Sequence, residues 1–73
     1  MTELGLYLAK KSINKAEISR KTGISASRLS ELTLNKGSHL RAKEIYLVAL
    51  AIDVDPCELM KFIFKDLKLK SKK

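Results

Sequence analysis

Most side chains in this sequence that could do chemistry are cationic. Fifteen lysine and arginine residues face eight acidic ones, a formal net charge of +7 over 73 residues. The single histidine, His39, and the single cysteine, Cys57, cannot make a metal-ligand cluster or an intramolecular disulfide. We expect an exposed loop residue at His39 and a small, partly buried apolar residue at Cys57. The chain is therefore predicted to be a non-enzyme without cofactor or metal.

The positive charge is concentrated in one part of the chain. Residues 10–43 carry nine basic and two acidic residues, which equals the net charge of the whole chain. Residues 44–64 are net negative and residues 65–73 are net positive. A basic surface confined to one segment is expected of a protein that binds a phosphate backbone. A solvated cationic face is the alternative.

Residues 13–35 have the pattern of two short helices joined by a tight turn. Asn14 can cap the first helix, and Glu17 three residues later can complete a reciprocal capping box. Gly23 can adopt the left-handed conformation past the end of that helix. Ser25 can then cap a second helix that runs to about Asn35. The pattern predicts a helix-turn-helix.

The remaining segments must position this motif, and their apolar residues recur at helical spacing. We predict an all-α domain of five helices, near residues 2–11, 15–21, 25–35, 41–52 and 56–64. Asn35 or Gly37 is expected in the left-handed conformation after the third helix. The domain is assigned to residues 1–64, and residues 65–73 to a frayed or disordered lysine-rich tail. The inward positions are Leu4, Tyr7, Leu8, Ile18, Thr22, Ser25, Leu29, Leu32, Thr33, Ile45, Val48, Ala49, Ile52, Leu59, Phe62 and Ile63.

The sequence also bears on location. No basic segment followed by an apolar one opens the chain, so no secretory signal is predicted. The longest apolar run, residues 45–52, is far shorter than the roughly 20 residues that span a bilayer. We therefore expect a cytoplasmic protein that does not contact a membrane.

Two segments resemble the lambda-repressor/Cro-type (XRE) helix-turn-helix family. INKAEISRKTGIS is similar to the family pattern Leu-(Ser/Asn)-Gln-x-Glu-Leu-Ala-x-x-x-Gly-(Val)-Ser, and YLVALAIDVDPCELM is similar to its Ile-Ala-x-Ala-Leu-x-Val-x-x-x-x-Leu ending. The resemblance covers Leu4 to about Met60. It implies a compact five-helix lambda-repressor-like fold and sequence-specific binding to double-stranded DNA. The expected role is that of a transcriptional regulator, most simply a repressor.

In this family the third helix enters the major groove. Alignment through Gly23 implies that the residues that contact bases are Ser25, Ala26, Ser27, Arg28 and Glu31. Arg28 is expected to pair with guanine, with a phosphate contact or an ion pair with Glu31 or Glu17 as alternatives. Glu31 would orient Arg28 or, less favoured, accept a hydrogen bond from cytosine N4. The resemblance and the charge together assign the phosphate contacts to Lys15, Lys36, Arg41 and Lys43.

Some residues depart from the family pattern. Ser19 stands where alanine is usual, and its hydroxyl is expected to bond back to the carbonyl four residues earlier. Asp53 replaces a common glycine and is expected to tolerate the left-handed conformation there.

The C-terminal half has more apolar residues than one small core needs, and these predict a homodimer through helices four and five. The candidate interface residues are Leu47, Leu50, Phe64 and Leu67. In the alternative, helix five folds back and buries them within one chain.

Two other functions stay open at this stage. An antitoxin-like module would sequester a protein partner through its apolar C-terminal half and bind DNA for autoregulation. RNA binding is less favoured, because aromatic residues are few and none is placed to stack on unpaired bases.

Overall fold

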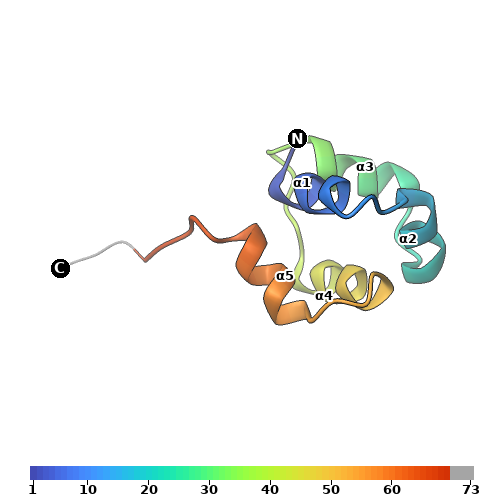
Figure 1. Ribbon diagram of the computed structural model, residues 1–73. Coiled ribbons are helices and arrows are strands. Elements are labelled where there is room, and N and C mark those ends of the chain that lie inside the picture. The colour runs from blue at the N-terminus through green and yellow to red at the C-terminus, as the bar shows by residue number, and fades with distance from the viewer. Residues whose placement is uncertain (70–73) are drawn as a thin grey trace.

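The structure is a computed structural model that describes residues 1–69 of the chain (Figure 1). These residues form five helices and no strand, which confirms the all-α prediction and places the boundaries close to those expected. The helices are α1 (Glu3–Lys10), α2 (Lys15–Thr22), α3 (Ala26–Leu34), α4 (Ala42–Ala51) and α5 (Pro56–Ile63).

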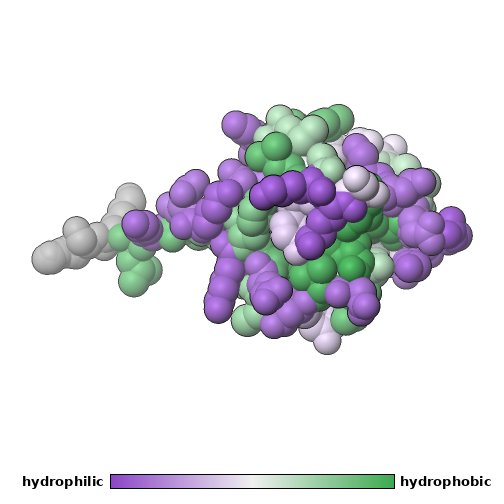
Figure 2. All heavy atoms as spheres, viewed as in Figure 1, coloured by the Kyte–Doolittle hydropathy of each residue, from purple (hydrophilic) through white to green (hydrophobic). Residues whose placement is uncertain are grey.

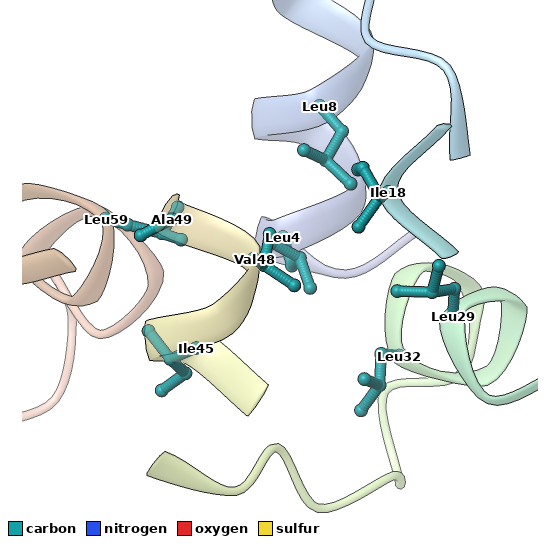
Figure 3. Close-up of a cluster of buried hydrophobic side chains, with 9 residues drawn as sticks. All are labelled: Leu4, Leu8, Ile18, Leu29, Leu32, Ile45, Val48, Ala49 and Leu59. Carbon is teal, nitrogen blue, oxygen red and sulfur yellow. The ribbon is translucent and has the colours of Figure 1, made fainter. Parts of the chain in front are cut away.

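The helices surround one core. Helix α1 packs against α3 and α5, α2 packs against α3 and α4, and α4 packs against α5 (Figure 1). Helices α3 and α4 do not pack backbone to backbone, although they follow one another in the chain. The side chains from all five helices that meet in the core (Figure 3) are Leu4, Leu8, Ile18, Leu29, Leu32, Ile45, Val48, Ala49 and Leu59.

The helical spacing identified this core correctly. Each of its nine residues was predicted to face inward, and Thr33 is buried beside them. Tyr7, Ile52 and Ile63 pack against the core but are only partly buried. Ser25 was predicted on the inward side and is exposed instead, because it serves as the cap of α3.

Four of the five helices begin at a residue whose side chain caps the first turn. Asn14 accepts a hydrogen bond from the Ala16 amide at 2.8 Å, as predicted. The reciprocal capping box is wrong, because the Glu17 carboxylate lies 2.9 Å from the guanidinium of Arg20 and pairs with it. An ion pair at this spacing offers Glu17 a charged donor in place of a backbone amide.

The start of α1 is attached to the end of α3. The Thr2 amide donates to the Thr33 carbonyl at 2.9 Å, and the Thr2 hydroxyl donates to the Leu32 carbonyl at 2.6 Å. These bonds satisfy two of the carbonyl groups that a helix leaves unpaired at its C-terminal end. Gly5 lies directly over the Thr33 carbonyl, where an added Cβ would collide with the oxygen. The two helices can therefore approach this closely only with glycine at position 5.

Left-handed backbone occurs at three places in the part of the chain that the structure describes. Gly23 has φ 81° and Asp53 has φ 63°, which confirms both predictions, and Ser12 adopts φ 56°. Neither Asn35 nor Gly37 is left-handed, contrary to expectation. The Asn35 side chain accepts from the Gly37 amide at 2.9 Å instead, and this bond turns the chain without a positive φ.

The segment after α5 begins close to the helices. Phe62, in the last turn of α5, packs its ring edge to face on Tyr7, with the ring centroids 5.0 Å apart. Lys65 follows α5, and its ammonium lies 4.1 Å from the Phe62 ring centroid and 3.3 Å from the Glu3 carboxylate. Over residues 66–69 the trace leads away from the helices (Figure 1). The predicted tail, residues 65–73, falls partly outside the described residues, and the boundary at residue 64 stays a prediction.

Figure 2 shows where hydrophilic and hydrophobic residues lie on one face of the molecule. Hydrophilic residues cover most of it, and apolar atoms show through between α1 and α4. None of the helices within residues 1–69 combines the length and the apolar character needed to cross a membrane.

We predict that Gly5→Ala destabilises the protein by about 1–3 kcal/mol, because the new methyl group must push α1 away from the Thr33 carbonyl. Helix propensity alone predicts the opposite sign, a gain of roughly 1 kcal/mol. Urea unfolding would measure the difference. Gly37→Ala is the matched control, since its Cβ would meet only the Asn35 side chain, at 3.3 Å. An equal or higher stability of Gly5→Ala would show that the close approach carries no constraint.

Candidate nucleic-acid interface

The turn between α2 and α3 is held by several short hydrogen bonds. The Gly23 amide donates to the Ser19 carbonyl at 2.9 Å as the chain turns left-handed. The Thr22 hydroxyl donates to the Ile18 carbonyl at 2.7 Å and accepts from the Ile24 amide at 3.1 Å. Because the turn is short and internally bonded, it fixes the angle between the two helices.

Ser19 contributes to this turn in a way that the sequence did not predict. Its hydroxyl donates to the Ile24 carbonyl at 2.7 Å, across the turn, and not to the carbonyl four residues earlier. The predicted back-bond is therefore wrong. The left-handed turn at Gly23 brings the Ile24 carbonyl within reach of Ser19, so the hydroxyl links α2 to the segment that enters α3.

Helix α3 presents one face to the core and the other to solvent. Ser25 caps it by accepting from the Arg28 amide at 3.1 Å, as predicted. Leu29, Leu32 and Thr33 face inward and are buried. The exposed residues of this helix and its cap are Ser25, Ala26, Ser27, Ser30, Glu31 and Leu34. Four of the five predicted base-contacting residues are in this set, and Arg28 is half-buried.

The Arg28 side chain is hydrogen-bonded to α4, to the loop that precedes α4, and to a neighbouring residue of α3. Its Nε donates to Glu44 Oε2 at 2.9 Å, and its Nη2 donates to Glu44 Oε1 at 3.1 Å and to the His39 carbonyl at 2.7 Å. Its Nη1 donates to Glu31 Oε1 at 3.1 Å. Of the two ion pairs given as alternatives for Arg28, the one with Glu31 is thus present, whereas Glu17 pairs with Arg20.

Glu44 is the residue at this site that sequence reasoning missed. It lies in the first turn of α4, where its carboxylate also accepts from the Arg41 amide at 3.0 Å. The Arg28 hydrogen bond is the main reason that the pKa of Glu44 is held below its ordinary value of about 4.5, and the Arg41 amide adds to this. The hydrogen bonds to Glu44 and to Glu31 raise the pKa of Arg28 further above its already high value. Glu44 therefore connects α4 to α3 through a charged side chain.

The loop between α3 and α4 is ordered by neighbouring bonds. The Ser38 hydroxyl lies within hydrogen-bond distance of two carbonyls, Glu31 at 3.1 Å and Asn35 at 2.7 Å. Arg28 holds the His39 carbonyl on the far side of the loop. The His39 side chain is exposed, as predicted. These bonds fix the positions of the basic residues that follow α3.

The four residues predicted to contact phosphate occupy two kinds of environment. Lys36, Arg41 and Lys43 are exposed, in the loop after α3 and at the start of α4. Lys15 is half-buried at the start of α2, and its ammonium donates to the Thr33 hydroxyl at 3.3 Å. An ammonium group has three N–H donors, so this bond leaves donors for another partner. Lys15 therefore lies against α3, while the other three lie beyond its C-terminal end.

Cys57 differs from its prediction. It was expected to be partly buried and is exposed. Its place in the first turn of α5, next to the cap at Asp55, explains the difference, because the inward stripe of that helix begins only at Leu59.

We predict that the Arg28–Glu44 contact makes stability depend on pH in the acid range. A carboxylate whose pKa is lowered in the folded state stabilises that state above its unfolded pKa, and this contribution is lost as the pH falls through the folded value. The free energy of unfolding should therefore fall below about pH 4.5, and it should fall less steeply in Glu44→Gln. Urea unfolding at several pH values would test this, with Glu58→Gln, an exposed residue of α5, as the control. Parallel pH profiles for the wild type and Glu44→Gln would contradict the assignment.

Comparison with known proteins identifies the family. Searches of curated proteins and of solved structures gave no match. A family model for the Cro/C1-type HTH DNA-binding domain matches residues 3–65 and so includes all five helices. This agrees with the resemblance noted in the two sequence segments. On this evidence the chain belongs to the Cro/C1-type helix-turn-helix DNA-binding family.

Proposed function

We propose that this protein is a transcriptional regulator that binds double-stranded DNA sequence-specifically, most simply a repressor that occludes promoter or operator DNA. The observation that carries the proposal is the exposed face of α3 in a chain that belongs to a DNA-binding family. A hydrogen-bonded turn holds this helix, and basic residues flank it. An α-helix fits the B-DNA major groove. The mechanism is binding, and α3 is the element that enters the groove.

The proposed contacts fall into two groups. Ser25, Ala26, Ser27, Arg28 and Glu31 lie on or beside the face that would meet base edges. The short side chains of Ala26 and Ser27 would let the helix approach closely. Lys15, Lys36, Arg41 and Lys43 are proposed to bind phosphate, which positions a protein on the duplex without reading its sequence. Selection of binding sites from a random duplex pool would test the proposal directly, and the enrichment of one motif is the expected result.

We propose that the protein acts as a homodimer through α4 and α5. Leu50 is 56% exposed on α4, and Phe64 and Leu67, which follow α5, are 38% and 73% exposed. Leu47 is only half-buried and could add area to such an interface. Apolar surface of this kind in a small domain favours a partner surface. A dimer would read two half-sites about 34 Å apart on one face of the duplex.

The antitoxin-like function remains the second candidate. It is favoured by the pair Tyr46 and Leu50, which lie one helical turn apart on α4 and are both more than half exposed. A protein partner could cover this face in place of a second copy. Co-expression with the product of an adjacent gene, followed by size-exclusion chromatography, would favour this function if a stable complex forms and the complex still binds DNA.

We predict that Lys36→Ala weakens binding to all duplex sequences alike, because a phosphate contact carries no sequence information. The slope of log K against log salt concentration should become shallower by about 0.9, the contribution of one neutralised phosphate. Fluorescence anisotropy at several salt concentrations would measure both quantities. Lys61→Ala, which removes an exposed lysine of α5, should leave the slope unchanged. A Lys36 variant that loses affinity only for the selected motif would contradict the phosphate assignment.

We predict that Leu50→Glu converts the dimer to a monomer, because a charge on the apolar face of α4 opposes its burial. Sedimentation velocity at micromolar concentration would show the change. Leu6→Glu is the matched control, since Leu6 on α1 is similarly exposed (47%) and lies outside the proposed interface. A wild-type protein that sediments only as a monomer would remove the dimer from the proposal.

A further inference from the structure

Three charged side chains form a continuous chain from α4 to the outer face of α3. Glu44 makes two hydrogen bonds to Arg28, and Arg28 makes one to Glu31. Solvent exposure rises along this chain, from 12% for the Glu44 side chain to 27% for Arg28 and 54% for Glu31. Glu44 is thus the inner end of the chain and Glu31 the outer end.

Arg28 has little hydrogen-bonding capacity left for a base. A guanidinium group has five N–H donors, and four hydrogen bonds from Arg28 are already formed, to Glu44, Glu31 and the His39 carbonyl. Bidentate pairing with guanine O6 and N7 needs two donors on neighbouring nitrogens. Arg28 could make that pairing only by giving up at least one bond that links α3 to α4 or to Glu31.

Glu31 is in the opposite situation. Its Oε1 accepts from Arg28, and no hydrogen bond within residues 1–69 uses its Oε2. It lies on the outer face of α3, one turn after Ser27 and one turn before Leu34, both of which are exposed. A free carboxylate is repelled by DNA phosphates, but the guanidinium 3.1 Å away, which Glu31 shares with Glu44, offsets part of its charge. Glu31 therefore combines acceptor capacity and exposure with a cation that offsets part of its charge.

We propose that Glu31 reads a cytosine by accepting a hydrogen bond from its N4 amine in the major groove, and that Arg28 positions Glu31. This inference rests on the proposed function as a DNA-binding regulator. Cytosine is favoured over adenine, because adenine places the acceptor N7 beside its N6 amine and a carboxylate has no donor to offer it. Glu44 in turn holds Arg28 from α4. The order of dependence is the reverse of the expectation that Glu31 orients Arg28.

The test begins with the motif that the wild-type protein selects from a random duplex pool. Each cytosine in a half-site is then changed, C·G to T·A, which removes the N4 amine. At one position the wild type should lose roughly 5- to 150-fold in affinity, the discrimination expected of a good base contact. A duplex with 5-methylcytosine at that position should bind normally, because it keeps the amine and adds only the methyl group of thymine.

Glu31→Ala should bind the C·G and T·A duplexes equally at that one position and should keep its discrimination at all others. Arg28→Lys and Glu44→Gln should each reduce discrimination at the same position, since neither can hold the carboxylate as the native pair does. Discrimination is a ratio of affinities, so a general loss of stability does not move it. Thermal unfolding of each variant confirms that the folded protein is being measured.

Two controls separate this proposal from its competitors. Replacing the paired guanine with 7-deazaguanine removes the N7 acceptor that a bidentate arginine needs, and wild-type affinity should not change. Glu17→Ala removes the same kind of ion pair, with Arg20 at i+3 and 2.9 Å, from α2 in place of α3. It should leave discrimination at every base pair unchanged.

The outcomes are distinct. If 7-deazaguanine weakens wild-type binding and Arg28→Lys abolishes that sensitivity, Arg28 reads guanine and the proposal is overturned. Unchanged discrimination in Glu31→Ala at every position would also overturn it, while the selected motif would still support the proposed function. If the wild type selects no motif from the pool, the proposed function fails, and this inference fails with it.

Discussion

A helix that enters a DNA groove must be held from one side only, because its other face has to stay open. In this protein α3 meets that constraint with three kinds of contact. Leu29 and Leu32 are buried in the core, Thr2 bonds to the carbonyls at the end of the helix, and Arg28 connects its flank to α4. The Arg28 contact is the one that joins α3 to α4, since these two helices do not pack backbone to backbone. The position of the basic loop between them depends on it.

The helices, the core and the main turn could be predicted because the residues that determine them are close in sequence. Helical spacing identified every buried apolar residue within residues 1–69, and glycine at position 23 marked the left-handed turn. Predictions that depended on a choice between nearby partners were less reliable. Glu17 pairs with Arg20 and not with a backbone amide, and the Ser19 hydroxyl donates to the Ile24 carbonyl and not to the carbonyl four residues earlier. Sequence spacing shows which partners are within reach but not which bond is the better one.

The candidate site illustrates the same limit at longer range. The sequence located α3 and its outward residues, but Glu44 is 16 positions from Arg28 and no local pattern connects them. Only the folded arrangement brings the start of α4 to the flank of α3. The surroundings of two other candidate residues also came only from the fold. Lys15 donates a hydrogen bond to Thr33, and Leu47 is less exposed than Leu50. The contacts of the candidate residues with DNA stay predictions.

The charge chain also affects how such a protein would search for its site. Arg28 pairs with two carboxylates, Glu31 and Glu44, so these three side chains carry a net charge of −1 and the reading face of α3 has no surplus positive charge of its own. Three exposed cations lie in the loop after α3 and at the start of α4, at Lys36, Arg41 and Lys43. In the proposed complex, backbone attraction comes from this flank and is independent of sequence, so the protein can slide along DNA. The face of α3, which has no surplus positive charge to attract phosphates in general, would then add affinity only where a matching base pair arrives, and this separates scanning from recognition.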